Sequence, residues 1–354
     1  MSRRRFFIAL VLLLLCIAGV SAYPEYAPYG EKVSYFYGSL SREEKELYDL
    51  IYDGVLDYRE TIEFPHGFDM DMVNKVITIL DDEAPELFWL GHTWSTTYYN
   101  SNPNVAVGVT MKYTMSEQEA IRRWKSIMKF SKSIETTGTN DLIDELTLLE
   151  TLMKHVTYVE GERAHNASGA IVDGKAVCEG YAKAATLLLR LHGIPSGVIG
   201  GTSVLDGKRD GHAWNIVRIG GEWTLFDLTW IDHEEASFYD WLNLSDEMFA
   251  DSHIPDDVPR SYYNSTDTYE IARILELYCY GNVKEHFFRE LEQLIESDIP
   301  VLIYFEDERL YDQMLKNHDA WIREYNDIHG KDGFYGKYSF SWNDRRRRFY
   351  LDWS

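Results

Sequence analysis

The Gly220-Gly221 pair, which separates two segments of alternating apolar residues, constrains the fold of this chain more than any other feature. Two adjacent glycines between strands are a strong signal for a two-residue β-hairpin turn, because both turn residues need a positive φ. With these glycines as the turn, Ile219 faces Glu222 and Trp214 faces Asp227. The sequence therefore predicts an antiparallel hairpin together with its register.

This register brings a histidine and an acid together. Side chains alternate along a strand, so His212, Trp214 and Asp227 share one face of the hairpin. His212 and Asp227 then become diagonal neighbours at ~7–8 Å between backbones, which is within side-chain reach. A carboxylate in this place can hold an imidazole in one tautomer and stabilise its charged form. The alternative is that both are ordinary polar residues of a sheet.

Cys178 begins a predicted helix over residues 178–192, which ends at Gly193. The first turn of a helix has unsatisfied N–H groups and the positive end of the dipole, and both favour the nucleophilic thiolate. A lone Cys is more often a buried structural residue, so that interpretation stays open. With His212 and Asp227, Cys178 completes a possible set of nucleophile, base and orienting acid.

The composition excludes several classes of partner. The 354-residue chain has 58 acidic and 35 basic residues and a net charge of -23. Nucleic-acid binders and binders of anionic membrane surfaces need a basic surface, so neither is expected. Apolar residues make up 45% and aromatic residues 14%, which is typical of a folded protein and not of a disordered acidic tail.

The N-terminus has the pattern of a secretory signal. Three arginines, Arg3 to Arg5, precede an apolar run over residues 6–19, and Val20-Ser21-Ala22 forms a small-x-small cleavage pattern. We expect a signal peptide over 1–22 and a secreted, extracellular or cell-surface protein with no membrane insertion after cleavage. An uncleaved anchor is the alternative, but the run is short for a span of ~20 residues.

Two cysteines, Cys178 and Cys279, remain after the predicted cleavage. An exported protein with two cysteines is not built on a disulfide framework. The two either form one bridge, or at least one of them is a free thiol. The sequence around Cys279, Leu277-Tyr278-Cys279-Tyr280, indicates core packing.

The chain is expected to have an irregular lead-in and three folded regions. We predict a lead-in over 23–40, an N-terminal α+β domain over 41–135, a core over 136–260 and a C-terminal α/β domain over 261–354. Residues 136–140, Thr-Thr-Gly-Thr-Asn, form the break before the core. Ser41 and Glu44 fit a capping box at the start of the first helix. Periodicity predicts further helices and strands; the helices are about 69–80, 116–132, 141–156, 283–297 and 307–325, and the strands 94–99, 105–114, 197–203, 212–219, 223–229, 301–305 and 346–353.

Three motifs in order resemble the core of the transglutaminase-like superfamily, most closely its bacterial secreted members. They are Val177-Cys178-Glu179-Gly180-Tyr181-Ala182, Gly211-His212-Ala213-Trp214-Asn215 and Asp227-Leu228-Thr229-Trp230. The resemblance covers about 145–235 and implies an α+β, papain-like fold in which the helix bearing the Cys packs on an antiparallel sheet. It also implies a Cys–His–Asp triad at Cys178, His212 and Asp227.

The resemblance implies acyl transfer at amide bonds of a protein or peptide substrate. We expect hydrolysis more than amine cross-linking, because water needs no second binding site. Glu179, Tyr181, Trp214 and Trp230 are candidates for lining the site, although both tryptophans are equally plausible as core residues. The backbone N–H of Cys178 is a candidate oxyanion donor. A side-chain donor is expected in 165–175, where Asn166, Ser168 and others stay open.

Glu179 stands where many relatives have Gln, and an acid pointing toward the nucleophile would oppose thiolate formation. No cofactor or metal is predicted, because the sequence has no phosphate-binding glycine motif and no His-x-x-x-His or Cys-x-x-Cys spacing. The alternative to an enzyme is a catalytically inactive binding or surface-structural protein that keeps the fold.

Overall fold

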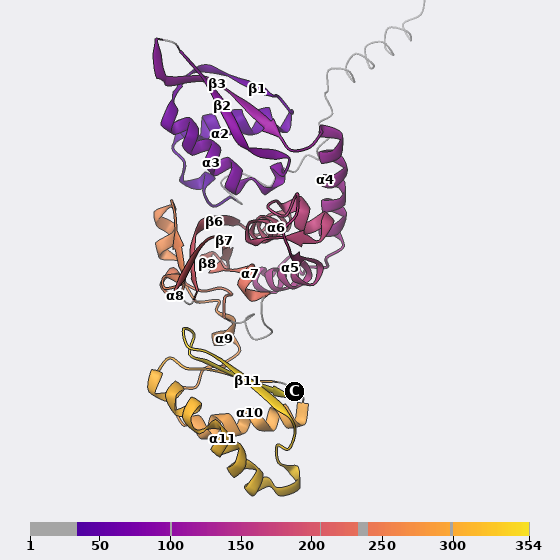
Figure 1. Cartoon of the computed structure of the whole chain (residues 1–354), viewed down its shortest axis with the longest axis vertical. Helices are drawn as coiled ribbons and strands as arrows, with labels where there is room; N and C mark the ends of the chain where they lie inside the picture. Colours follow the sequence, from indigo (N-terminus) through magenta and orange to yellow (C-terminus); the bar gives the residue numbers. More distant parts are fainter. Residues whose placement is uncertain (1–33, 100, 206, 233–239, 298–299, 354) are drawn as a thin grey trace, which may run out of the picture. The chain divides into compact units, whose positions relative to one another are not determined.

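The computed structural model describes residues 34–99, 101–205, 207–232, 240–297 and 300–353 (Figure 1). The predicted signal peptide over 1–22 lies outside the described residues. The chain divides into two compact units, Met1–Val198 and Ile199–Ser354. The three regions predicted from the sequence, with boundaries at 136 and 261, stay predictions.

The first unit begins with a three-stranded sheet, ordered β1-β3-β2, and two helices. The elements are α2 (Arg42–Leu56), β1 (Thr61–Asp69), α3 (Met70–Glu83), β2 (Leu90–Tyr99) and β3 (Asn102–Tyr113), with short 3-10 turns at Tyr37–Ser39 and Pro85–Leu87. Ser41 and Glu44 form the predicted capping box at the start of α2. β1 was not predicted, because Pro65 and Gly67 interrupt its sequence pattern, and its pairing with β3 shifts register there.

The first unit continues with the helix that carries Cys178. The elements are α4 (Glu117–Lys132), α5 (Asp141–His155), β4 (Thr157–Tyr158), a π-helical turn η3 (Gly169–Asp173), β5 (Lys175–Ala176) and α6 (Cys178–Leu191). α5 packs against α6. Arg190 of α6 is fully buried and donates to Glu83 Oε1 at 2.7 Å and to the Ser196 carbonyl. These contacts tie the far end of α6 to the N-terminal region of the same unit.

The second unit begins with a four-stranded sheet, ordered β8-β7-β6-β9. Its strands are β6 (Ser196–Leu205), β7 (Lys208–Ile219), β8 (Glu222–Phe226) and β9 (His253–Pro255). The predicted hairpin is confirmed, with Ile219 opposite Glu222 and a positive φ at both Gly220 and Gly221. The predicted end of the second strand at 229 is wrong, because a short helix, α7 (Leu228–Ile231), follows Phe226.

The C-terminal part of this unit is a second, smaller α/β layer. A short helix, α8 (Asp246–Phe249), precedes β9. The elements after β9 are η5 (Arg260–Asn264), α9 (Ile271–Ile274), α10 (Val283–Ser297), β10 (Val301–Tyr304), α11 (Glu308–His329), η6 (Gly330–Asp332), β11 (Tyr338–Asn343) and β12 (Arg348–Trp353). The antiparallel sheet β10-β12-β11 and both long helices enclose an apolar core around Phe287, Leu291, Met314 and Phe349. Helices beside antiparallel sheets make the protein an α+β fold.

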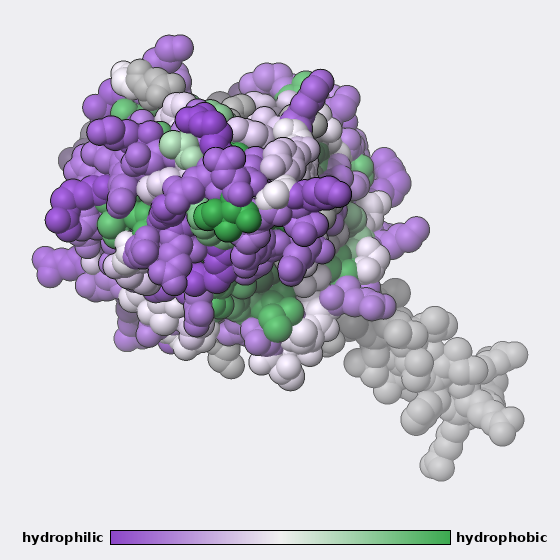
Figure 2. Space-filling view, turned by 90° about the horizontal axis from the view of Figure 1, so that it is seen from below, coloured by the Kyte–Doolittle hydropathy of each residue, from purple (hydrophilic) through white to green (hydrophobic). Residues whose placement is uncertain are grey.

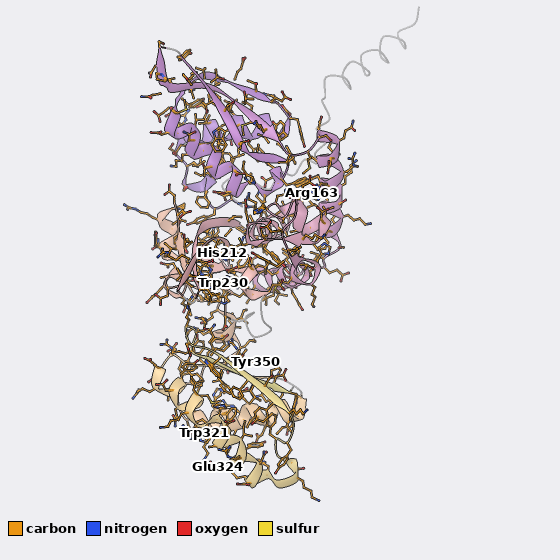
Figure 3. The ribbon with its side chains drawn as sticks, in the orientation of Figure 1. Arg163, His212, Trp230, Trp321, Glu324 and Tyr350 are labelled. Atoms are coloured by element: carbon orange, nitrogen blue, oxygen red, sulfur yellow. The ribbon has the colours of Figure 1, made fainter. Side chains whose placement is uncertain are left out.

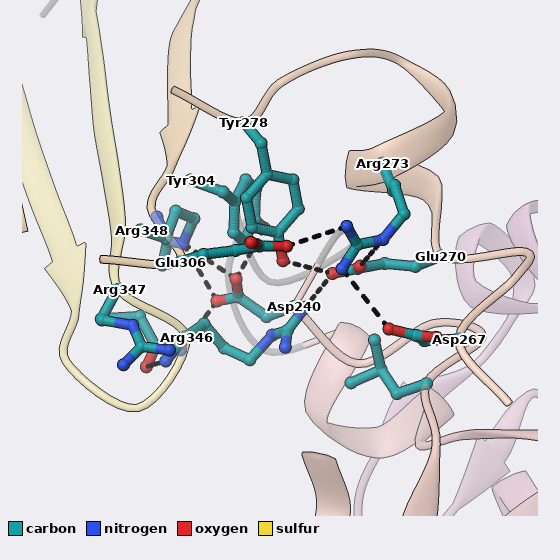
Figure 4. Close-up of polar contacts among 12 residues, drawn as sticks. Asp240, Asp267, Glu270, Arg273, Tyr278, Tyr304, Glu306, Arg346, Arg347 and Arg348 are labelled. Carbon is teal, nitrogen blue, oxygen red and sulfur yellow. Dashed lines mark hydrogen bonds and ion pairs between the residues drawn. The ribbon is translucent and has the colours of Figure 1, made fainter. Parts of the chain in front are cut away.

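Two arginines of the basic block at 345–348 are internal residues. Arg346 and Arg348 are buried and contact the equally buried Glu270 and Asp240 (Figure 4). Tyr304 donates to the same Asp240 at 2.7 Å. These two arginines of the block therefore neutralise acids of the chain itself.

The face drawn in Figure 2 is mostly hydrophilic, with apolar residues in small separate patches. Among the described residues, no helix combines the length and the apolar character that a membrane span requires.

Candidate functional site

Cys178 is the first residue of α6 and is half-buried. No side chain caps the start of this 14-residue helix. The N–H groups of its first turn therefore remain available to stabilise negative charge at the sulfur. Cys178 and Cys279 are both free thiols, so they do not form the bridge that the sequence left open. Cys279 is 2% exposed, and burial raises its pKa, which suits a packing residue.

Gly180 explains how the helix start is held in place. A Cβ at this position would lie 2.0 Å from the carbonyl oxygen of Ala164. The turn that contains Ala164 is also bonded to the helix start, because the Val177 N–H donates to the Ala164 carbonyl at 3.0 Å. Only glycine allows this close approach.

The carboxylate of Glu179 is paired inside the first unit. It accepts from Lys183 Nζ at 2.7 Å and contacts His165 Nδ1 at 3.0 Å. Burial would raise the pKa of Glu179, but the charge and hydrogen bonds of Lys183 and His165 hold it below its usual range. Lys183 also lies 3.9 Å from Asp81. The acid next to Cys178 is therefore an ionised group with its own cation, and not an uncompensated charge.

A cavity of about 380 Å³ lies beside this charged group, within the first unit. Glu179 and Lys183 line it from α6, and His92 and Asp81 line it from β2 and α3. His92 Nδ1 lies 2.7 Å from Asp81 Oδ2. The other lining residues are the apolar Leu80, Ala84, Pro85, Leu87, Phe88 and Leu90 and the polar or charged Thr114, Glu162, Arg163, His165 and Asn166. The cavity therefore has a mixed lining in which charged groups are numerous.

The segment 165–175 holds the two named candidates for a side-chain oxyanion donor. Ser168 is fully buried, accepts from Arg123 Nε at 2.9 Å and donates to Asn166 Oδ1 at 3.0 Å. Ser168 thus uses its hydroxyl within the fold. Asn166 is half-buried and lines the cavity. Tyr181, the other α6 candidate, is buried and donates its hydroxyl hydrogen to the Val156 carbonyl.

His212 and Asp227 lie together in the second unit, as the hairpin register predicted. His212 Nε2 is 2.6 Å from Asp227 Oδ2, and the side chains are 7% and 0% exposed. His212 stands on β7, and Asp227 directly follows β8. The ring of His212 contacts Trp214 and Trp230, with centroids 6.3 and 5.7 Å away. Figure 3 labels His212 and Trp230 in the second unit.

Asp227 also caps a helix, which the predicted strand over 223–229 did not indicate. It is the N-cap of α7, and its Oδ1 accepts from the backbone N–H groups of Thr229 at 2.9 Å and Trp230 at 3.2 Å. Burial would raise the pKa of Asp227, but the charge of His212 and the hydrogen bonds of two imidazoles hold it well below its usual range. Thr229 is therefore a helical residue and not a strand partner of His212.

The second imidazole belongs to His253, which the sequence analysis did not select. Its Nε2 lies 3.0 Å from Asp227 Oδ2, and its side chain is fully buried. Aromatic rings surround it, including Trp214 at 4.9 Å and Trp230 at 4.5 Å between centroids. Both tryptophans therefore line the His–Asp pair. His253 begins the three-residue strand β9, whose pairing with β6 no short-range pattern predicts.

The ligand atoms of His212, Asp227 and His253 lie within 4.8 Å of one another, a donor set that also occurs around metal ions. Two ligands bound at about 2.0–2.1 Å in a tetrahedral zinc site are ~3.3 Å apart. The separations of 2.6 and 3.0 Å are shorter and match hydrogen bonds. The geometry favours protons, and not a metal ion, between these groups.

Residues 129–228 match the family model of the transglutaminase-like superfamily. This segment contains Cys178, His212 and Asp227, each in the motif that carries the resemblance. This segment of the chain is thus similar to the core of the transglutaminase-like superfamily. No curated protein matches the chain.

Two solved structures show what the chain is similar to. A TGase structure aligns with 48% of this chain and 50% of its own at 15% identity and a TM-score of 0.29. The periplasmic domain of TgpA from Pseudomonas aeruginosa aligns with 39% of this chain and 63% of its own at 16% identity and a TM-score of 0.24. The chain therefore spans about half to three fifths of these proteins.

Proposed function

We propose that this protein is an exported, thiol-dependent acyl-transfer enzyme that acts on amide bonds of proteins or peptides. Cys178 is the nucleophile, His212 the general base and acid, and Asp227 the acid that orients His212. The observation that carries the proposal is the buried contact between His212 Nε2 and Asp227 Oδ2 at 2.6 Å. The family match over 129–228 supports the same class of chemistry.

The contact supports Nδ1 as the nitrogen of His212 that exchanges protons with the thiol in the proposed mechanism. Because Nε2 of His212 faces Asp227, the proton of the thiol is exchanged at Nδ1. His212 takes the proton of Cys178, and the thiolate attacks the carbonyl carbon of the amide. The carbon–nitrogen bond then breaks as His212 returns the proton to the leaving amine, and a thioester remains. The backbone N–H of Cys178 is the proposed oxyanion donor.

Water completes the proposed cycle. His212 takes a proton from water, the resulting hydroxide attacks the thioester, and the carboxylic acid leaves as the thiol of Cys178 re-forms. An amine in place of water would give a new amide and thus cross-linking. We propose hydrolysis, because water needs no second binding site.

The first test compares thiol reactivity in the wild type with that of a His212→Gln variant. Iodoacetamide labelling of Cys178 is followed by peptide mass spectrometry between pH 5 and 9. We expect wild-type Cys178 to react at pH 6 at least tenfold faster than in the variant, because an imidazolium stabilises the thiolate. His66→Gln, an exposed histidine paired with Glu46, is the matched control and should behave as wild type. Equal rates in wild type and His212→Gln would contradict the proposal.

The second test measures turnover. A peptide library is incubated with wild type and with Cys178→Ala, in the presence and absence of a primary amine. We expect cleaved peptides with the wild type alone and no dependence on the amine. Amine-linked products would mean that the enzyme transfers the acyl group to amines instead of hydrolysing the amide. The same products from wild type and Cys178→Ala would favour an inactive binding protein.

A further inference from the structure

Asp227 receives hydrogen bonds from two imidazoles, and the proposed triad uses only one of them. His212 Nε2 and His253 Nε2 contact the same oxygen, Oδ2, at 2.6 and 3.0 Å. The other oxygen, Oδ1, accepts from the backbone N–H groups of Thr229 and Trp230. The carboxylate therefore accepts four hydrogen bonds in a place where it is 0% exposed.

The protonation of His253 follows from its partners. A lone pair facing an anionic oxygen would be repulsive, so Nε2 of His253 carries hydrogen and donates to Asp227. On the other side of the ring, Nδ1 lies 2.8 Å from Ser252 Oγ. The Ser252 hydroxyl has two acceptors in reach, because its Oγ also lies 3.1 Å from the Phe249 carbonyl, and the contact with Nδ1 is the shorter one. A hydroxyl hydrogen that points to Nδ1 selects the neutral tautomer that donates to Asp227.

The surroundings keep His253 neutral and fixed. The ring lies among Phe249 and Trp241 at 4.4 and 5.5 Å between centroids, in addition to the two tryptophans already described. The charged groups that face it are Asp227, His212 and Arg345. Burial lowers the pKa of His253, and the charges of His212 and Arg345 lower it further. Asp227 raises this pKa, but the net result is a lowered value.

We propose that His253 is a positioning residue that shares Asp227 with His212 and so limits how strongly the carboxylate binds the His212 proton. A donor that stabilises the charged carboxylate weakens it as a base. Without this donor, Asp227 would act on His212 alone, and the imidazolium of His212 would release its proton less readily. The effect on catalysis rests on the proposed function. The sharing of Asp227 by the two imidazoles is independent of that function.

The test compares two substitutions of similar size. His253→Phe keeps a ring in the aromatic cage but has no N–H, whereas His253→Gln places an amide N–H near the original Nε2. Both are made in a Cys178→Ala background, with histidines labelled with ¹⁵N, and the ring nitrogens are followed by NMR against pH. We expect His253→Phe to raise the titration midpoint of His212 by about half a unit to one unit, and His253→Gln to restore it.

Ser252→Ala is a third variant that leaves the cage intact. It removes the hydroxyl that selects the tautomer of His253 and should shift the His212 midpoint in the same direction by a smaller amount. Near-UV circular dichroism checks that the aromatic cage persists. An unchanged or lowered His212 midpoint in His253→Phe overturns the proposal, and so does a His253→Gln variant that behaves like His253→Phe. A stoichiometric metal ion in the wild type that is lost in His253→Gln would also overturn it.

The catalytic arm uses the protein with Cys178 intact. We expect His253→Phe to lower kcat by about tenfold with little change in KM, and His253→Gln to recover most of it. If wild-type Cys178 proves unreactive, the proposed function fails, while the NMR result still decides the role of His253.

Discussion

Asp227 is the residue on which the proposed chemistry depends most directly, because it connects the base to the fold. We expect Asp227→Asn to keep the N-cap of α7, since Asn is as good a cap as Asp. It removes the charge that stabilises a His212 imidazolium, so kcat should fall on the order of 10³–10⁴-fold. The measurement is peptide turnover, with the midpoint of thermal unfolding recorded beside it.

Asp251→Asn is the matched control, since Asp251 is exposed and lies in the same unit. Its turnover and its unfolding midpoint should both match the wild type. An Asp227→Asn variant that keeps wild-type turnover would show that His212 needs no anionic partner.

The pairing of His212 with Asp227 could be predicted from the sequence, because the glycine turn fixes the register of two short strands. The cap formed by Asp227 could not be predicted in the same way, since an acid before Leu228 fits a strand equally well. His253 is 26 residues away from Asp227 in sequence. Its contact depends on the pairing of β9 with β6, which is a long-range property of the sheet.

At the scale of elements, the start of α6 depends on one close contact. We expect Gly180→Ala to destabilise the first unit by at least about 1–3 kcal/mol, because the new Cβ would overlap the Ala164 carbonyl at 2.0 Å. A shifted first turn should also slow iodoacetamide labelling of Cys178. Urea unfolding and labelling rates measure the two effects.

Gly200→Ala is the control for the Gly180 substitution. A Cβ at Gly200 would meet nothing within 4 Å, and the residue has no positive φ. Its unfolding should change by less than about 0.5 kcal/mol. If Gly180→Ala is equally harmless, the contact with Ala164 does not determine the helix start.

Glu86, in the 3-10 turn Pro85–Leu87, should make the stability of the first unit depend on pH. Burial raises its pKa to about 7, and Tyr52 donates to its Oε1 at 3.0 Å. The unfolded chain loses this proton near pH 4.5, so the folded state binds more protons between about pH 4.5 and 7, and stability falls as pH rises through that window.

Glu86→Gln keeps the hydrogen bond to Tyr52 and removes the titration. We expect the variant to match the wild type near pH 4.5 and to be more stable by about 3 kcal/mol at pH 8. Urea unfolding at both pH values measures the difference, and Glu43→Gln, an exposed substitution, is the control. A stability difference between Glu86→Gln and wild type that does not change with pH would contradict the raised pKa of Glu86.

Long periodic helices were the elements that the sequence predicted best. The helix predicted over 283–297 is α10, and the one predicted over 307–325 is α11, which extends to His329. β1 was missed because Pro65 and Gly67 break its alternation. β11 was not predicted, although Tyr338, Phe340 and Trp342 alternate with polar residues along it. For β1, the pairing with β3 outweighed a weak local pattern.

For the whole molecule, two buried ion pairs neutralise acids inside the second unit. Of the basic block at 345–348, Arg346 contacts Glu270 and Arg348 contacts Asp240, over sequence separations of 76 and 108 residues. Local sequence patterns could not identify these partners, because the paired residues are so far apart in the chain. Such pairs join segments that are distant in sequence, and they form only when the second unit folds.

The pair of Asp240 and Arg348 offers the last prediction, because both residues are buried and their contact is well defined. Arg348 Nε lies 3.1 and 3.0 Å from the two carboxylate oxygens, and Tyr304 also donates to Asp240 (Figure 4). Asn343 donates to Asp240 as well. Arg348→Met leaves a buried carboxylate without its cation, and should cost about 3–5 kcal/mol of unfolding free energy.

A double-mutant cycle separates the pair from its surroundings. Asp240→Asn alone leaves the guanidinium without its anion, whereas Asp240→Asn with Arg348→Met removes both charges. The double variant should therefore lose less than the sum of the single variants, by about 1–3 kcal/mol, in urea unfolding. Glu150→Gln, which breaks an exposed pair with Lys154, should change stability by less than about 0.5 kcal/mol. Additive losses in the cycle would mean that the charges act independently, and that the arginine contributes to the core through its packing alone.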